Sequence, residues 1–313
     1  MVKTLAAFIL RGPLQAIGVA LLSGLLAFVV PPLTIVTGGV VALVTLRNGA
    51  KAGLIVVAGT AGVLAVLAYA ALSELSQLLT YLTSLVLAVI PVWGLAWVLR
   101  TTVSLSKTVL VAALLGALLV TLMHLTLADP VEWWNQVLTL ALQPAIESGQ
   151  LGIEGLNVEQ TIRAIAELMT GVMAGAMVIS FLVALAIGRG LQGLLYNPGG
   201  FNREFNEIRL GTTLAGVSLA ALLVALLFDS SMGNYASDLL WVFGAIYMLP
   251  GIAVAHSWMA QMAKPTPWLI GFYLLLLFVP HVMALLAFLG WSDSWVNIRG
   301  WIGRRKGSDR SGE

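Results

Sequence analysis

Long apolar stretches, separated by short polar segments, fill almost the whole chain. A helix needs roughly 20 apolar residues to cross a bilayer, and lipid offers no partner for an unpaired backbone group. Each stretch therefore predicts a membrane helix. The second is short and follows two prolines, which predicts a helical hairpin or a broken, re-entrant pair over 13–46. The stretches cover residues 13–30, 33–46, 53–72, 80–99, 108–128, 169–188, 211–228, 239–262 and 267–290.

Three shorter amphipathic stretches predict helices that lie at the membrane surface. The sequence Asp-Pro-Val-Glu at 129–132 is a typical helix start and predicts a helix over 130–143 that ends at Pro144. Apolar residues recur at helical spacing in 201–209 and again in 291–303. Such helices rest with their apolar face on the acyl chains and their polar face in the headgroups.

Composition places the chain among membrane proteins. Of its 313 residues, 59% are hydrophobic and only 10% are charged, and the mean hydropathy is +0.97. An ordinary soluble domain has roughly 25% charged residues. We therefore predict an all-α fold, a polytopic transmembrane helix bundle with eight or nine spans, in a single integral membrane domain over 1–313.

Charged residues assign the loops to two sides of the membrane. Basic residues gather in the loops of one side, among them Arg47, Arg100 and Arg189, whereas the loop 129–168 holds six acidic residues and one arginine. Because cytoplasmic loops are enriched in Lys and Arg, the N-terminus and the loop 189–210 are predicted inside and 129–168 outside.

The basic tail 291–313 leaves the number of spans open. Nine crossings would put this tail outside, against the charge rule. The alternative is that 239–262 is broken at Leu249-Pro250-Gly251, because proline removes a helix hydrogen bond and Pro-Gly favours a turn. Eight crossings would then keep the tail inside.

The three histidines all lie in apolar stretches and are the candidates for ligand binding. With nine crossings His124 and His281 both fall in the outer half, with His256 nearer the inner side; with eight, His281 moves inward. The alternative is a neutral imidazole that hydrogen-bonds a neighbouring helix. Asp229 and Asp238 flank a predicted outer loop, so no acidic partner for a proton relay is expected in the middle of a span.

No motif indicates an enzyme, a cofactor or a metal site. The spacing of Gly188, Gly190 and Gly193 matches a dinucleotide-binding loop, but such a loop follows a strand, and here an apolar helix precedes it. The glycines are instead predicted to end that helix at the inner surface. The absence of cysteine excludes disulfides and thiolate sites, and no basic run is long enough to bind nucleic acid.

The first apolar stretch carries small residues at steps of four: Ala16, Ala20 and Gly24. Such a face lets another helix approach closely, so it is a candidate for docking a partner subunit. The alternative is packing within the chain. The pair Gly171 and Gly175 has the same spacing and is interpreted as a chance match.

The loop 196–210 is a second candidate for partner docking. Phe201 and Phe205 share one face of its predicted helix, and Arg203 and Arg209 supply charge. The alternative is a helix that only rests on the inner leaflet.

Three motifs suggest a family: Tyr196 to Gly211, Gly251 to His256, and Gly290 to Arg299. They resemble a proteobacterial branch of the YybS-like predicted membrane proteins, whose function is unknown. That family is distantly similar to the S-components of energy-coupling-factor transporters, which bind a vitamin or a metal ligand. Those subunits depend on a transmembrane coupling subunit and two ATPases, and an Ala-x-x-x-Ala pattern, matched here by Ala16 and Ala20, faces the coupling subunit.

The resemblance implies a multipass protein of the bacterial inner membrane that binds a small ligand and relies on partner ATPases. The chain departs from S-components because it is longer, has eight or nine predicted segments in place of six, and has a large outer loop. A second hypothesis is therefore a non-transporting scaffold that recruits a cytoplasmic partner through 196–210 and the basic tail.

Overall fold

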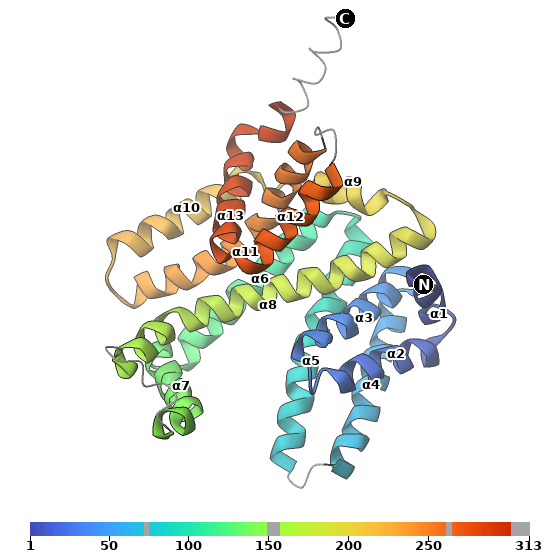
Figure 1. Cartoon of the computed structure of the whole chain (residues 1–313), viewed down its shortest axis with the longest axis horizontal. Coiled ribbons are helices and arrows are strands. Elements are labelled where there is room, and N and C mark those ends of the chain that lie inside the picture. Colours follow the sequence, from blue (N-terminus) through green and yellow to red (C-terminus); the bar gives the residue numbers. More distant parts are fainter. Residues whose placement is uncertain (72–74, 149–156, 261–264, 302–313) are drawn as a thin grey trace, which may run out of the picture. The chain divides into compact units, whose positions relative to one another are not determined.

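The computed structural model describes residues 1–71, 75–148, 157–260 and 265–301, and these residues are almost entirely helical, with no strand among them (Figure 1). The basic residues Arg304, Arg305, Lys306 and Arg310 of the tail and Glu154 of the outer loop lie outside the described residues. The helices are α1 (Val2–Ile9), α2 (Pro13–Leu26), the 3-10 turn η1 (Pro31–Leu33), α3 (Thr34–Asn48), α4 (Ala50–Ala71), α5 (Leu75–Thr102), α6 (Leu105–Thr126), α7 (Pro130–Glu147), α8 (Val158–Tyr196), α9 (Gly200–Asn206), α10 (Gly211–Leu227), α11 (Ser231–Met259), α12 (Pro265–Phe278) and α13 (Pro280–Val296).

The predicted class, an all-α bundle of membrane helices, is confirmed. In the described part, α4, α5, α6, α8 and α11 are long and apolar enough to cross a membrane, and two helix pairs with a sharp bend raise the number to seven. This is fewer than eight or nine, because α2 and α3 are only about 21–23 Å long, less than the roughly 30 Å of a bilayer core.

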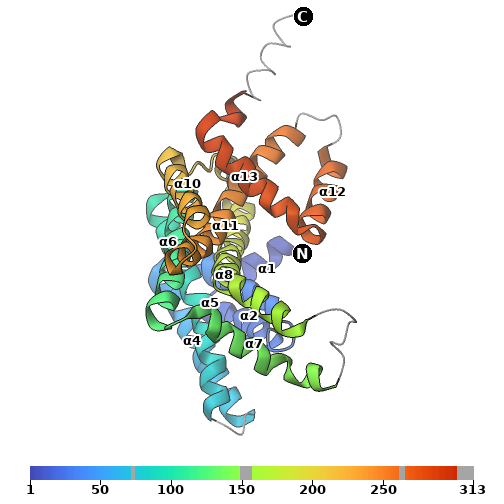
Figure 2. The ribbon, with the colours of Figure 1, turned by 90° about the vertical axis from the view of Figure 1, so that its left-hand side faces the viewer.

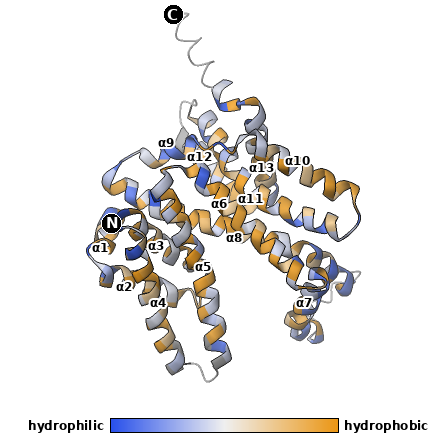
Figure 3. Cartoon of the chain, turned by 180° about the vertical axis from the view of Figure 1, so that it is seen from behind, coloured by the Kyte–Doolittle hydropathy of each residue, from blue (hydrophilic) through white to orange (hydrophobic). Residues whose placement is uncertain are grey.

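Apolar side chains point outward from the bundle as well as inward. Only 28% of the apolar window in α4 is buried inside the protein. Figure 3 shows hydrophobic residues along α10, where Leu222, Leu223, Leu226 and Leu227 are all exposed. Exposed apolar surface on this scale requires lipid in place of water as the solvent.

The chain divides into two compact units. Unit 1 comprises residues 1–112, 179–209 and 252–269, and unit 2 comprises residues 113–178, 210–251 and 270–313. The helices α6, α8, α11 and α12 contribute residues to both.

In unit 1, the helices α2 to α5 pack around α3 (Figure 1). The pair of helices predicted over 13–46 is present: α2 and α3 lie side by side, and the hydroxyls of Ser23 and Thr37 are 2.8 Å apart. The glycine motif of α8 also lies here. Gly188 does not end its helix, which continues to Tyr196; a Cβ at this position would lie 2.8 Å from the backbone nitrogen of Leu43 in α3. The glycine therefore permits close packing of two helices.

The prolines act differently from the prediction. Neither Pro250 nor Pro144 ends its helix, since α11 runs on to Met259 and α7 to Glu147. The interruption lies at Pro280, the first residue of α13, where α12 and α13 meet at an angle (Figure 2). A proline costs nothing at a helix start, and inside a membrane helix neighbouring groups can satisfy the carbonyl that it frees.

The surface helices are only partly as predicted. Asp129 caps α7 as expected, because its Oδ1 accepts the N–H of Val131 at 2.9 Å. The second helix is the short α9. The third is divided: residues 291–296 continue α13, which ends before Asn297 and its left-handed backbone, and residues 298–301 are helical again.

Candidate functional site

An ionisable pair joins two candidate spans within unit 2. His124 lies in the last turn of α6 and Asp238 lies in α11, and their Nε2 and Oδ2 atoms are 2.7 Å apart. Asp238 is 6% exposed, and the side chain of His124 is 16% exposed. Asp238 was expected to flank an outer loop, but it lies within α11, because this helix begins at Ser231, eight residues before the predicted span. A candidate span therefore carries an acidic partner for a histidine, two turns from the start of the helix.

Further polar groups surround this pair. The N–H of Gly171 donates to the second oxygen of Asp238 at 2.9 Å. The ring of Tyr235 packs edge-on against the imidazole of His124, with 5.3 Å between centroids, and its hydroxyl is 2.9 Å from that of Thr121. With Asp238 ionised, the carboxylate can only accept, so Nε2 of His124 carries the proton. The cluster binds α6, α8 and α11 together at one end.

The close approach of α8 and α11 depends on two glycines. A Cβ on Gly171 would overlap the ring of Trp241 and lie 2.9 Å from the Cα of Asp238, and one on Gly175 would lie 2.9 Å from the carbonyl oxygen of Trp241. Their spacing is therefore not a chance match, since it forms the surface on which α11 packs. Beside them, Trp134 of α7 donates its indole N–H to the hydroxyl of Thr170 at 3.0 Å.

Residues 18–294 match a family described as predicted membrane proteins, DUF2232. The chain belongs to this family. Comparison with the curated proteins and with the solved structures gave no match. Membership of DUF2232 agrees with the apolar helices of the structure, and it makes the lipid bilayer a partner of this protein.

The three histidines of this DUF2232 protein have different surroundings, and His124 and His281 belong to unit 2. His256 belongs to unit 1, where its ring is 6.2 Å from that of Phe205. His281 is exposed in the first turn of α13. Among the described residues no group of three or more His, Asp or Glu side chains is arranged to hold a metal ion.

The small-residue face of the DUF2232 chain is covered by the chain itself. Ala16 is 1% exposed and Ala20 is fully buried. Gly24 is also buried, and a Cβ there would lie 3.1 Å from a methyl group of Leu64 in α4. A coupling subunit could reach this face only if α2 moved away from α4.

The inner loop is likewise folded onto its own unit. Phe201 and Phe205 are both half-buried, with 6.1 Å between their ring centroids. Arg203 and Arg209 have exposed side chains, and the backbone N–H of Arg209 donates to the hydroxyl of Ser106 at 3.0 Å. The arginines of the predicted docking surface are thus accessible, and the phenylalanines are partly used in internal packing.

Sequence reasoning identified His124 and missed Asp238, Gly171 and Tyr235. A local signal for the start of α11 was present: Asp229 and Ser230 are residue types that favour helix N-caps. Starting the helix there would have placed Asp238 two turns inside it.

Proposed function

We propose that this DUF2232 protein is a membrane subunit that binds a small ligand from the outer side and depends on partner ATPases for energy. The resemblance to YybS-like proteins and, more distantly, to S-components suggests this role. The supporting observation is the pair of His124 and Asp238. Ionisable residues within membrane spans are rare and mark ligand or ion pathways.

The chemistry of the pair suggests the class of ligand. Asp238 offers a carboxylate and His124 an imidazole, at the end of the bundle that the charge rule predicts to be outside. A ligand with a cationic or hydrogen-bond-donating group could replace the imidazole or the N–H of Gly171 on the carboxylate. The sequence contains no nucleotide-binding motif, which agrees with the proposal that partner ATPases supply the energy for transport.

The alternative function is a scaffold that recruits a cytoplasmic partner. The exposed side chains of Arg203 and Arg209 favour it, because they remain accessible on the predicted inner surface. The half-buried state of Phe201 and Phe205 limits the apolar area that α9 can offer.

Purification of the intact protein from its own host, in a mild detergent, tests the two functions. A ligand-binding subunit should bring with it a transmembrane coupling subunit and ATPases, or a bound metabolite that raises the melting temperature of the protein. Mass spectrometry of the purified material identifies both. A different stoichiometric partner without any ligand would contradict the transport role and favour the scaffold.

The absence of native cysteine allows a clean test of the predicted orientation. Gln143 in α7 and Arg203 in α9 are both exposed, so a cysteine at either position is accessible from its own side of the membrane. We expect Q143C to react with a membrane-impermeant maleimide in intact spheroplasts, and R203C to react only after permeabilisation. The reverse pattern would place the loop 189–210 outside.

A further inference from the structure

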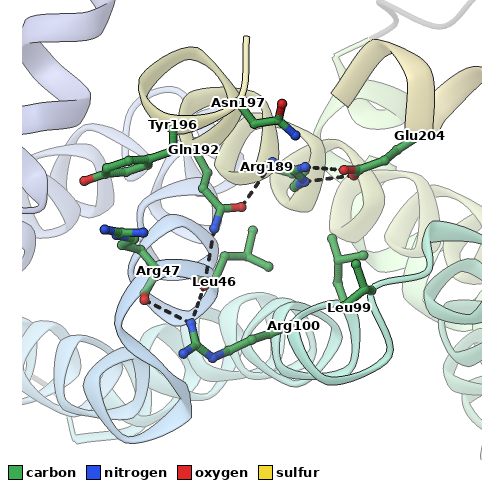
Figure 4. Close-up of a pocket in the computed structure, with 10 residues that line it drawn as sticks. Leu46, Arg47, Leu99, Arg100, Arg189, Gln192, Tyr196, Asn197 and Glu204 are labelled. Atoms are coloured by element: carbon green, nitrogen blue, oxygen red, sulfur yellow. Dashed lines mark hydrogen bonds and ion pairs between the residues drawn. The ribbon is translucent and has the colours of Figure 1, made fainter. Parts of the chain in front are cut away.

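A cavity of about 470 Å³ lies in unit 1, where α3, α5 and α8 end (Figure 4). Arg47, Arg100 and Tyr196 are exposed, so the cavity is open to the surface. Its polar lining comprises Arg47, Arg100, Arg189, Gln192, Asn197 and Glu204.

Two of the arginines have fixed partners. Arg189 forms a two-pronged ion pair with Glu204, with 2.9 Å from Nε to Oε2, and donates to Gln192 at 3.2 Å. Arg100 donates to two carbonyl oxygens in the last turn of α3, those of Leu46 and Arg47. These bonds satisfy the end of α3 and hold both guanidinium groups in place along the wall of the cavity.

Arg47 is different, because no acidic side chain among the described residues forms an ion pair with it. Its guanidinium lies 3.9 Å from the ring centroid of Tyr196, and the described part of the chain gives it no hydrogen bond and no ion pair. A guanidinium carries five N–H donors in a planar fork. The ring contact holds the fork in place while its donors stay available at the cavity.

The surrounding charge favours an anion. The segments 47–51 and 100–107 contain four basic residues and no acidic one. The carboxylate of Glu204 pairs with Arg189, and Arg100 meets the partial negative charge of about one half at the end of α3. Of the three arginines that line the cavity, Arg47 is therefore the one whose positive charge is not balanced by a negative group of the lining.

The size of the cavity favours an organic ligand over a bare ion. Small-molecule pockets measure roughly 300–1,000 Å³, whereas a water molecule occupies about 30 Å³. A volume of about 470 Å³ therefore exceeds what one small inorganic anion needs. Arginine binds phosphate groups with two parallel hydrogen bonds, and basic pockets on the cytoplasmic side of membrane proteins bind anionic headgroups.

We infer that this cavity binds a phosphate-bearing organic anion, with Arg47 as its main contact. The ligand is a phospholipid headgroup of the inner leaflet or a soluble phosphate ester, which share this chemistry. The site belongs to unit 1 and does not depend on the proposed role of His124 and Asp238 in unit 2.

The test uses the full-length protein in two arms. In the first, native mass spectrometry measures how much phosphatidylglycerol stays bound relative to phosphatidylcholine. In the second, glycerol 3-phosphate is titrated into the protein in phosphatidylcholine nanodiscs. We expect R47Q to weaken binding about tenfold, since a hydrogen bond to a charged group contributes about one factor of ten or more. R203Q removes the same charge from the exposed face of α9 and should bind as the wild type does.

The two arms identify the source of the ligand. Binding of the lipid alone identifies a headgroup site, and binding of glycerol 3-phosphate identifies a site for soluble esters. R47K keeps the charge but loses the planar fork of donors, so its affinity should lie between those of the wild type and R47Q. If R47Q does not purify as a monodisperse protein, R47K is used in its place. The inference is overturned if neither probe binds, if R47Q or R47K binds as well as the wild type, or if R203Q loses as much affinity as R47Q.

Discussion

Replacing Gly290 by alanine is expected to separate α13 from α11 and to destabilise the protein by about 3 kcal/mol. A Cβ at this position would overlap the carbonyl oxygen of Tyr247 and lie 2.7 Å from the backbone nitrogen of Gly251. Backbone atoms of a helix cannot move aside as a flexible side chain can, so the two helices themselves would have to move apart. Thermal unfolding in mild detergent, followed by circular dichroism, measures the loss.

Gly244 provides a matched control in the same region. It lies in α11, two turns before Gly251, and a Cβ there would meet nothing within 4 Å. Because alanine favours a helix over glycine by about 1 kcal/mol, G244A should be neutral or slightly stabilising. If G290A unfolded at the same temperature as the wild type, this would contradict the close contact of α11 and α13 at Gly290.

This crossing explains why two of the sequence motifs contain glycine. Gly251 opens one motif and Gly290 the other, and the two residues meet where α11 and α13 touch. The same end of α13 is anchored by Trp291, whose indole N–H donates to the carbonyl oxygen of Ala215 at 3.2 Å. Asp293 accepts from Arg299 at 2.7 Å. Resemblance to a family can thus arise from positions that pack helices together, without implying that they bind a ligand.

The elements with local causes could be predicted from the sequence. The apolar stretches predicted the helical class, Asp129 predicted the start of α7, and Pro31-Pro32 predicted the turn between α2 and α3. Each depends on residues within a few positions of one another, so no knowledge of distant contacts is needed.

The effect of a proline could not be predicted in the same way, because it depends on the residues packed against it. Pro250 sits inside α11 beside Gly290, with its ring 3.0 Å from the position that a Cβ of that glycine would take. The missing side chain of Gly290 leaves room for this ring where α13 packs against α11. The partner is 40 residues away in sequence, and nothing near Pro250 reveals it.

For the same reason, only part of the candidate site could be predicted from the sequence. His124 stands out because a histidine in an apolar stretch is rare, but its partner is 114 residues further along the chain. A misplaced start of α11 was sufficient to move Asp238 from the helix to the edge of a loop. The role of Gly171 and Gly175 depends on Trp241 and Asp238, which pack against them and lie far away in the sequence.

The pair of His124 and Asp238 is expected to show a large coupling energy in a double-mutant cycle. H124L leaves a buried carboxylate with only the N–H of Gly171, and removing one partner of a buried pair costs about 3–5 kcal/mol. D238L leaves an imidazole that can stay neutral, so it should cost less. The double variant H124L/D238L leaves no charge buried and should regain most of the lost stability. Thermal unfolding of the four proteins in one detergent measures the cycle.

The double variant also separates a structural pair from a binding site. If the two residues only hold α6, α8 and α11 together, a folded H124L/D238L protein should still purify with the metabolite and the partners of the wild type. If they bind the ligand, the same folded protein should lose the metabolite, because neither a carboxylate nor an imidazole remains to hold it. Additive single effects in the cycle would instead show that the two side chains do not interact, and the proposed site at the end of these helices would then lose its basis.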